Sequence, residues 1–221
     1  MWRSSMLRGF VVALAFVAAG AVAAETQNGG AREFKAYVEL DTRGDRLGES
    51  VRNRVIYFVN YGCRYCRQAH TYLPAWGQSL PEPLGFEVVP AVALREHLPM
   101  AVAYYAVLVT APERLHDFER ELYRLLAEIG RSAWDGDAYR LAAERVGIDR
   151  EAFIASTQSD EVALYVRRAH ELTMLFELDE VPTVVIAGRF KTTPGVVQND
   201  QTMFTRLING LVSAVYEELV R

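Results

Sequence analysis

The apolar positions of this chain switch between strand-like and helix-like spacing. Short runs of β-branched and aromatic residues, separated by polar turns, predict five strands: Phe34–Leu40, Arg54–Asn60, Phe86–Leu94, Val181–Ile186 and Arg189–Thr192. The last two flank a turn at Gly188, which predicts a hairpin. The stretch Asp41–Ser50 is polar and contains two glycines, so we expect a loop there.

Apolar residues at helical spacing predict seven helices: 63–79 with a kink at Pro74, 100–109, 115–129, 137–146, 149–155, 159–178 and 199–220. Met100–Val109 is apolar on every side, which indicates a buried helix. Thr110 and Glu113, with Pro112 between them, fit a capping box at the start of the following helix.

The order of these elements predicts an α/β domain interrupted by a helical-bundle insertion. Segments 25–98 and 180–221 together have the size of one small α/β domain, and 99–179 forms the insertion. The last two strands must therefore pair with the first ones across about 80 residues of helices.

The N-terminal 24 residues have the pattern of a secretory signal peptide. Arg3 and Arg8 precede an apolar stretch from Phe10 to Ala24, which ends in small residues that fit a cleavage site. An uncleaved anchor is the alternative, although the apolar stretch is short for a membrane span. The formal net charge of −4 argues against nucleic acid or an anionic membrane surface as the main partner.

The only two cysteines of the chain form the motif Cys63-Arg64-Tyr65-Cys66, between a predicted strand and a predicted helix. In an exported protein, such a pair can cycle between dithiol and disulfide. The helix N-terminus, Arg64 and Arg67 should stabilise a thiolate at Cys63 and lower its pKa. We expect Cys63 to be the nucleophile and the more buried Cys66 to resolve the mixed disulfide.

Two other uses of a C-x-x-C motif are less well supported. Zinc needs two further ligands, and His70 supplies only one at a suitable spacing. Covalent haem needs a histidine directly after the second cysteine, where this chain has Arg67. We therefore expect no metal and no cofactor besides the redox-active disulfide, and we expect His70 to lie on the surface or along a groove.

Taken together, several stretches resemble the DsbA family of periplasmic thiol:disulfide oxidoreductases, which have a thioredoxin-like fold. The resemblance rests on the strand before Cys63, the C-x-x-C helix, the long insertion, and two stretches, Gly147–Phe153 and Val181–Phe190. It implies a central mixed sheet flanked by helices. It also implies that Pro182 is cis and that Val181, Pro182 and Thr183 support the active site beside Arg64 and Tyr65.

The resemblance also implies partners and a compartment. The substrates would be unfolded or partly folded exported proteins with free cysteines, which pair with the Val181 backbone as an added strand near an apolar groove. A membrane quinone-linked reoxidase of the DsbB type would restore the disulfide. We expect a periplasmic monomer that introduces disulfide bonds into exported proteins.

Two departures from the family pattern leave the redox potential open. Arg64-Tyr65 replaces the best-known Pro-His dipeptide, and Tyr57 stands where thioredoxin-like proteins often have a buried carboxylate. The alternatives are a periplasmic reductase or isomerase of the same fold, and a non-catalytic chaperone-like binding module. Isomerases of this fold usually have an N-terminal dimerisation domain, for which too few residues precede Arg54.

Overall fold

The computed structural model describes residues 35–42 and 46–220. The predicted signal peptide, 1–24, lies outside this range. The strands of the described part are β1 (Val38–Glu39), β2 (Arg54–Val59), β3 (Gly85–Pro90), β4 (Thr183–Ile186) and β5 (Phe190–Thr192). Its α-helices are α1 (Arg46–Ser50), α2 (Arg64–His70), α3 (Leu73–Gly77), α4 (Leu98–Thr110), α5 (Leu115–Ala127), α6 (Gly136–Arg145), α7 (Arg150–Thr157), α8 (Asp160–Leu175) and α9 (Gln201–Leu219). Short 3₁₀ helices lie at Arg95–His97, Pro112–Arg114 and Pro194–Val197.

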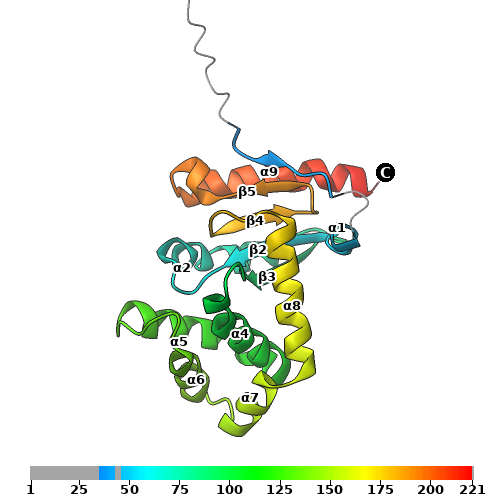
Figure 1. The fold of residues 1–221 in the computed structure, drawn as a ribbon. Coiled ribbons are helices and arrows are strands. Elements are labelled where there is room, and N and C mark those ends of the chain that lie inside the picture. The colour runs from blue at the N-terminus through cyan, green and yellow to red at the C-terminus, as the bar shows by residue number, and fades with distance from the viewer. Residues whose placement is uncertain (1–34, 43–45, 221) are drawn as a thin grey trace, which may run out of the picture. The chain divides into compact units, whose positions relative to one another are not determined.

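The five strands form one mixed sheet in the order β1-β5-β4-β2-β3 (Figure 1). β2 runs parallel to β3 and antiparallel to β4, and β4 and β5 form the predicted hairpin. Residues Val55–Val59 of β2 are all buried, as expected for a strand between two neighbours and covered on both faces. The predicted mixed sheet flanked by helices is therefore confirmed.

Successive side chains of a strand point to opposite faces of the sheet, and different residues cover the two faces of β2. Tyr57 stacks on Phe86, and Trp76 of α3 packs against the same ring at 6.2 Å. The Trp76 indole also donates a hydrogen bond of 2.8 Å to Asn209 of α9. Phe58 instead packs edge-on against Phe176, which follows α8, with ring centroids 5.9 Å apart.

The helices between β3 and β4 are arranged around α4, which contacts α5, α6, α7 and α8. Most residues of α4 are buried, which confirms the predicted buried helix. Figure 1 shows α8 running from these helices to the side of the sheet. Thr173 of α8 fixes this arrangement, because its hydroxyl oxygen accepts a hydrogen bond of 3.1 Å from the backbone N–H of Val92, just after β3.

Some predicted boundaries were wrong. The first strand covers only Val38–Glu39 of the described residues, and β3 ends at Pro90. The polar stretch predicted as a loop contains α1. The predicted helix 63–79 is two helices separated at Thr71 and Tyr72. Pro74 lies in the first turn of α3, where a missing N–H has no cost, so it begins a helix rather than kinking one.

The predicted capping box at Thr110 and Glu113 was also wrong. Thr110 is the last residue of α4, so its backbone is helical rather than extended as an N-cap requires. A 3₁₀ turn, Pro112–Arg114, leads into α5, which begins at Leu115 without a side-chain cap. In the described part of the chain, no helix is both long enough and apolar enough to cross a membrane.

Candidate active site

A tight turn after β2 places Cys63 at the start of α2. The backbone N–H of Cys63 donates to the Asn60 carbonyl at 3.0 Å, and the Asn60 side chain accepts from the N–H of Gly62 at 2.8 Å. Cys63 is the N-cap of α2, one position earlier than the predicted first turn, and its sulfur accepts from the backbone N–H of Cys66 at 3.4 Å. The sulfur therefore occupies a position where helices stabilise negative charge.

These contacts lower the pKa of Cys63 to about 6. The main cause is the hydrogen bond from the Cys66 thiol, which outweighs the opposite effect of partial burial, and N–H groups of Cys66 and Tyr65 add to it. The charge of Arg64 is the smallest of these contributions. At neutral pH a thiol with this pKa is roughly nine-tenths thiolate, so Cys63 is ready to act as a nucleophile.

Cys66 has the opposite environment. Its side chain is fully buried, and burial is the main reason why its pKa lies far above the usual thiol value. The Cys66 sulfur accepts a weak hydrogen bond of 3.4 Å from the Asn60 N–H. Tyr57 lies close by, but its hydroxyl donates to the backbone carbonyl of Cys66 at 3.0 Å rather than to the thiol. Cys66 is therefore a protonated thiol when reduced.

The loop before β4 lies against Cys63. The Val181–Pro182 peptide bond is cis, and the Cys63 thiol donates a hydrogen bond of 3.3 Å to the Val181 carbonyl. Pro182 and Thr183 are buried, and the Thr183 hydroxyl donates to the Glu180 carbonyl at 2.7 Å. β4 pairs with β2 directly below, with Thr183 opposite Phe58. The sheet thus brings together two motifs that are 118 residues apart.

Arg64 and Tyr65 interact mainly with each other. The Arg64 guanidinium donates to the Tyr65 hydroxyl and lies 4.4 Å from the centre of its ring. Both side chains are exposed at the N-terminal end of α2. The prediction that arginine charge stabilises the thiolate therefore holds for Arg64 only as a small effect, and hydrogen bonds provide most of it.

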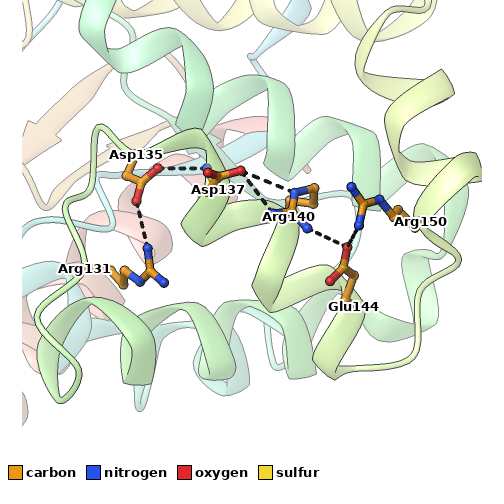
Figure 2. A network of polar contacts seen from close by, with 6 residues as sticks. All are labelled: Arg131, Asp135, Asp137, Arg140, Glu144 and Arg150. Carbon is orange, nitrogen blue, oxygen red and sulfur yellow. Dashed lines mark hydrogen bonds and ion pairs between the residues drawn. The ribbon is translucent and has the colours of Figure 1, made fainter.

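A pocket of about 410 Å³ opens beside Cys63. Aromatic side chains and the guanidinium groups of three arginines line much of it: Tyr61, Tyr123, Trp134, Arg64, Arg67 and Arg131. Figure 2 shows how Arg131 is held: it pairs with Asp135 at 3.4 Å, and Asp135 also caps α6 through the N–H of Asp137. Arg140 and Arg150 continue this network by pairing with Glu144.

His70 does not lie on the surface or along a groove as expected. It is buried where α5 covers the inner side of α2, with 8% of its surface exposed. Its Nε2 lies 3.5 Å from a carboxylate oxygen of Glu119, and its ring packs near Tyr123. Glu119 was not predicted as a site residue, although a carboxylate among the apolar positions of the amphipathic helix α5 is a signal that the sequence offers. Among the described residues, no three His, Cys, Asp or Glu side chains converge as metal ligands.

Comparisons with known proteins agree with this geometry. Residues 54–205 match the model of the DSBA-like thioredoxin domain. The thiol:disulfide interchange protein DsbA of Bordetella parapertussis is 22% identical over 210 residues, which cover 95% of this chain and 97% of that protein.

Two solved structures have the same thioredoxin-like fold. Pseudomonas aeruginosa DsbA has a TM-score of 0.73 at 18% identity, with 85% of this chain and 95% of that chain covered. Proteus mirabilis DsbA, solved with a non-covalently bound cysteine-containing peptide, has a TM-score of 0.64 at 20% identity, with 81% and 96% covered. The chain therefore belongs to the family of DSBA-like thioredoxin domains and is a thiol:disulfide oxidoreductase.

Proposed function

We propose that this protein donates disulfide bonds to exported proteins through Cys63 and Cys66. The observation that carries the proposal is the opposite character of the two thiols, which are three residues apart. Cys63 has a pKa of about 6, whereas Cys66 is buried and its pKa is raised. A stabilised Cys63 thiolate favours the reduced form of the pair, and this makes the disulfide form a stronger oxidant.

The proposed reaction has two exchange steps. A substrate thiolate attacks the Cys63 sulfur of the protein disulfide, which forms a mixed disulfide and releases Cys66 as a thiolate that takes up a proton. A second substrate thiolate then attacks the substrate sulfur of the mixed disulfide and releases Cys63 as its stable thiolate. The substrate dithiol loses two electrons, and the protein disulfide gains them.

We assign the loop Val181–Thr183 to substrate positioning. The Val181 carbonyl lies next to the Cys63 sulfur, so an extended substrate segment could pair with this backbone while its cysteine reaches Cys63. The peptide bound to Proteus mirabilis DsbA supports a cysteine-containing segment as the ligand. Pro182 and Thr183 would hold this loop in place, and Arg64 and Tyr65 would border the substrate on its other side.

The remaining assignments rest on the sequence and on the family. We propose that residues 1–24 are a cleaved signal peptide and that the mature protein acts in the periplasm as a monomer. A membrane quinone-linked partner of the DsbB type would reoxidise it. We further assign 25–98 and 180–221 to one thioredoxin-like domain and 99–179 to a helical insertion, which contributes Tyr123 and Arg131 to the pocket beside Cys63.

The reduction potential of the pair tests the direction of transfer. Purified mature protein is equilibrated in glutathione buffers, and the fractions of dithiol and disulfide are measured by alkylation and mass spectrometry. A value near −120 mV is expected for a disulfide donor. A value of about −250 mV or lower would instead make the protein a reductase.

A further inference from the structure

A cluster of buried polar side chains lies between α2 and α5, and two of its members, Tyr61 and Tyr123, also line the pocket beside Cys63. Glu119 is 5% exposed and His70 is 8% exposed. The Tyr61 hydroxyl donates a hydrogen bond of 2.7 Å to one oxygen of Glu119, and His70 Nε2 lies 3.5 Å from the other. Tyr123, one turn after Glu119 on α5, packs against both Tyr61 and His70 with ring centroids 5.2 and 5.3 Å away.

The hydrogen-bonding capacity of this cluster is not used up. Both ring nitrogens of His70 and the hydroxyl of Tyr123 are buried and have no hydrogen-bond partner among the described residues. Burying such groups without a hydrogen-bond partner destabilises a fold, so unpartnered buried groups are rare in native proteins. Transfer of a proton is one function that such a cluster of buried polar groups can have.

The cluster borders the buried thiol of the active site. His70 follows Cys66 by one turn of α2, so the two side chains lie on the same side of the helix. After burial, a charge on Cys66 is the largest cause of the raised pKa of Tyr123, ahead of Glu119 and Cys63. Tyr123 therefore lies within electrostatic range of both cysteines and of the carboxyl group.

We propose that Glu119 exchanges a proton with Cys66 in each reaction cycle, through the side chains of Tyr123 and His70. Glu119, which lies on α5, acts on Cys66 through these side chains and is therefore a positioning residue. It takes the place of the buried carboxylate that thioredoxin-like proteins often have where this chain has Tyr57. This inference rests on the proposed roles of Cys63 and Cys66.

Cys66 must gain a proton when substrate is oxidised and lose it again when the protein disulfide is restored. When substrate attacks Cys63, Cys66 leaves as a buried thiolate, and the protonated Glu119 gives it a proton and becomes a carboxylate. Solvent protons then restore Glu119 by way of the pocket that Tyr61 and Tyr123 line. During reoxidation, the Glu119 carboxylate accepts the proton of the Cys66 thiol, which attacks the mixed disulfide on Cys63 and displaces the partner as a thiolate.

The pKa values of Glu119 and His70 are compatible with proton exchange between Glu119 and Cys66. Burial raises the pKa of Glu119 to about 7, and the hydrogen bond from Tyr61 works against this rise. Burial, and then His116, lowers the pKa of His70 to about 4, so near neutrality the shared proton belongs to the carboxyl group. The other titratable groups near the cluster come from β2 and the turn after it, α2, α4, α5 and α6: Tyr57, Tyr61, Cys63, Cys66, Tyr104, His116, Tyr123 and Tyr139.

Reaction of the reduced mature protein with oxidised glutathione tests the inference, because it separates the two cysteines. The first step forms a Cys63–glutathione mixed disulfide, and its decay measures the attack by Cys66. Acid quenching and mass spectrometry follow both steps between pH 5 and 9. In the wild type, the decay rate should rise with pH up to about 7 and then bend. Glu119→Gln should remove the bend and slow the decay near pH 7 on the order of 100-fold.

The matched control is Glu121→Gln, on the same helix. Glu121 pairs with Arg124 and with Arg145 of α6, and the hydrogen bond from Arg124 is the main reason why its pKa is lowered to about 2. This variant should keep the wild-type decay rate and bend. In this control, the rate of the first step, which reports attack by Cys63, should also match the wild type.

Tyr61→Phe keeps the proposal testable if Glu119→Gln does not fold. It removes the hydrogen bond that lowers the pKa of Glu119, so the bend should move to higher pH. Wild-type profiles in Glu119→Gln, or an unmoved bend in Tyr61→Phe, would overturn the inference. No oxidation of the wild-type pair by oxidised glutathione, neither to a mixed disulfide nor to the Cys63–Cys66 disulfide, would instead refute the proposed function.

Discussion

The two ends of the C-x-x-C motif show how one helical turn can hold two very different thiols. At the outer end, Cys63 caps α2, receives hydrogen bonds from Cys66, and faces a pocket with arginines at its edge. At the inner end, Cys66 is fully buried, with Tyr57 and Tyr123 within electrostatic range of it. The two pKa values differ mainly because Cys63 accepts a hydrogen bond from the Cys66 thiol, with backbone N–H groups adding to it, whereas Cys66 is buried. The charge of Arg64 contributes less.

The largest effect is expected from removing each sulfur in turn. Cys63→Ser should abolish exchange, with a loss of at least ~10³-fold, because a serine hydroxyl is not ionised at neutral pH. Cys66→Ser should keep the attack at Cys63 but stop the resolving step, so mixed disulfides accumulate. Exchange of the reduced variants is followed with a disulfide-bonded peptide, and trapped adducts are detected by non-reducing mass spectrometry. Equal activity in both variants would mean that the two sulfurs do not have distinct roles.

The next effect is the pH dependence of the Cys63 thiolate. Its pKa in the folded, reduced protein is about 6, below the value of 9.0 for a free thiol. A lowered pKa stabilises the fold above the unfolded value, and this stabilisation is lost as the pH falls through about 6. The thiolate absorbance near 240 nm should therefore titrate around pH 6, and alkylation should slow about tenfold per pH unit below it.

The oxidised protein is the control for this titration, since it lacks the thiolate. The difference in thermal midpoint, reduced minus oxidised, should shrink between pH 8 and pH 5. A constant difference across this range would contradict a stabilising thiolate at Cys63.

Much of this architecture could be predicted because the signals are local. The β-branched run of β2, the hairpin of β4 and β5, and the buried face of α8 each follow from residues within one element. His70 and Glu119 could not be placed in this way. The sequence of α2 does not show whether His70 faces water or another helix. The residues that cover His70 lie on α5, about 50 positions later in the chain. The prediction for Thr110 was wrong for a related reason: Met100–Val107 of α4 are mostly buried against other helices, and the helix continues through Thr110, a residue that by itself favours a cap.

A smaller effect is expected at the inner end of the motif, from Tyr57→Phe. The change removes the hydrogen bond from the Tyr57 hydroxyl to the Cys66 carbonyl and keeps the ring that packs on Phe86. The free energy of unfolding should fall by about 1 kcal/mol, measured by urea denaturation. The rate of the first exchange step should not change. If the resolving step slows as much as in Glu119→Gln, the proton would instead pass through Tyr57.

The smallest effect is expected at the outer end, from Arg64→Ala. Arg64 is exposed and stacks on Tyr65, and its charge is the smallest cause of the lowered pKa of Cys63. Solvent screens such a charge, so the alkylation rate of Cys63 near pH 6 should fall only about twofold, and less in high salt. Arg67→Ala is the matched control, since Arg67 lines the same pocket but is not among the main causes of this pKa shift. A tenfold fall specific to Arg64→Ala would show that this arginine replaces the histidine found between the cysteines in the family's best-known motif. The hydrogen bonds from Cys66 and the N-terminus of α2 would then be the minor source of thiolate stability.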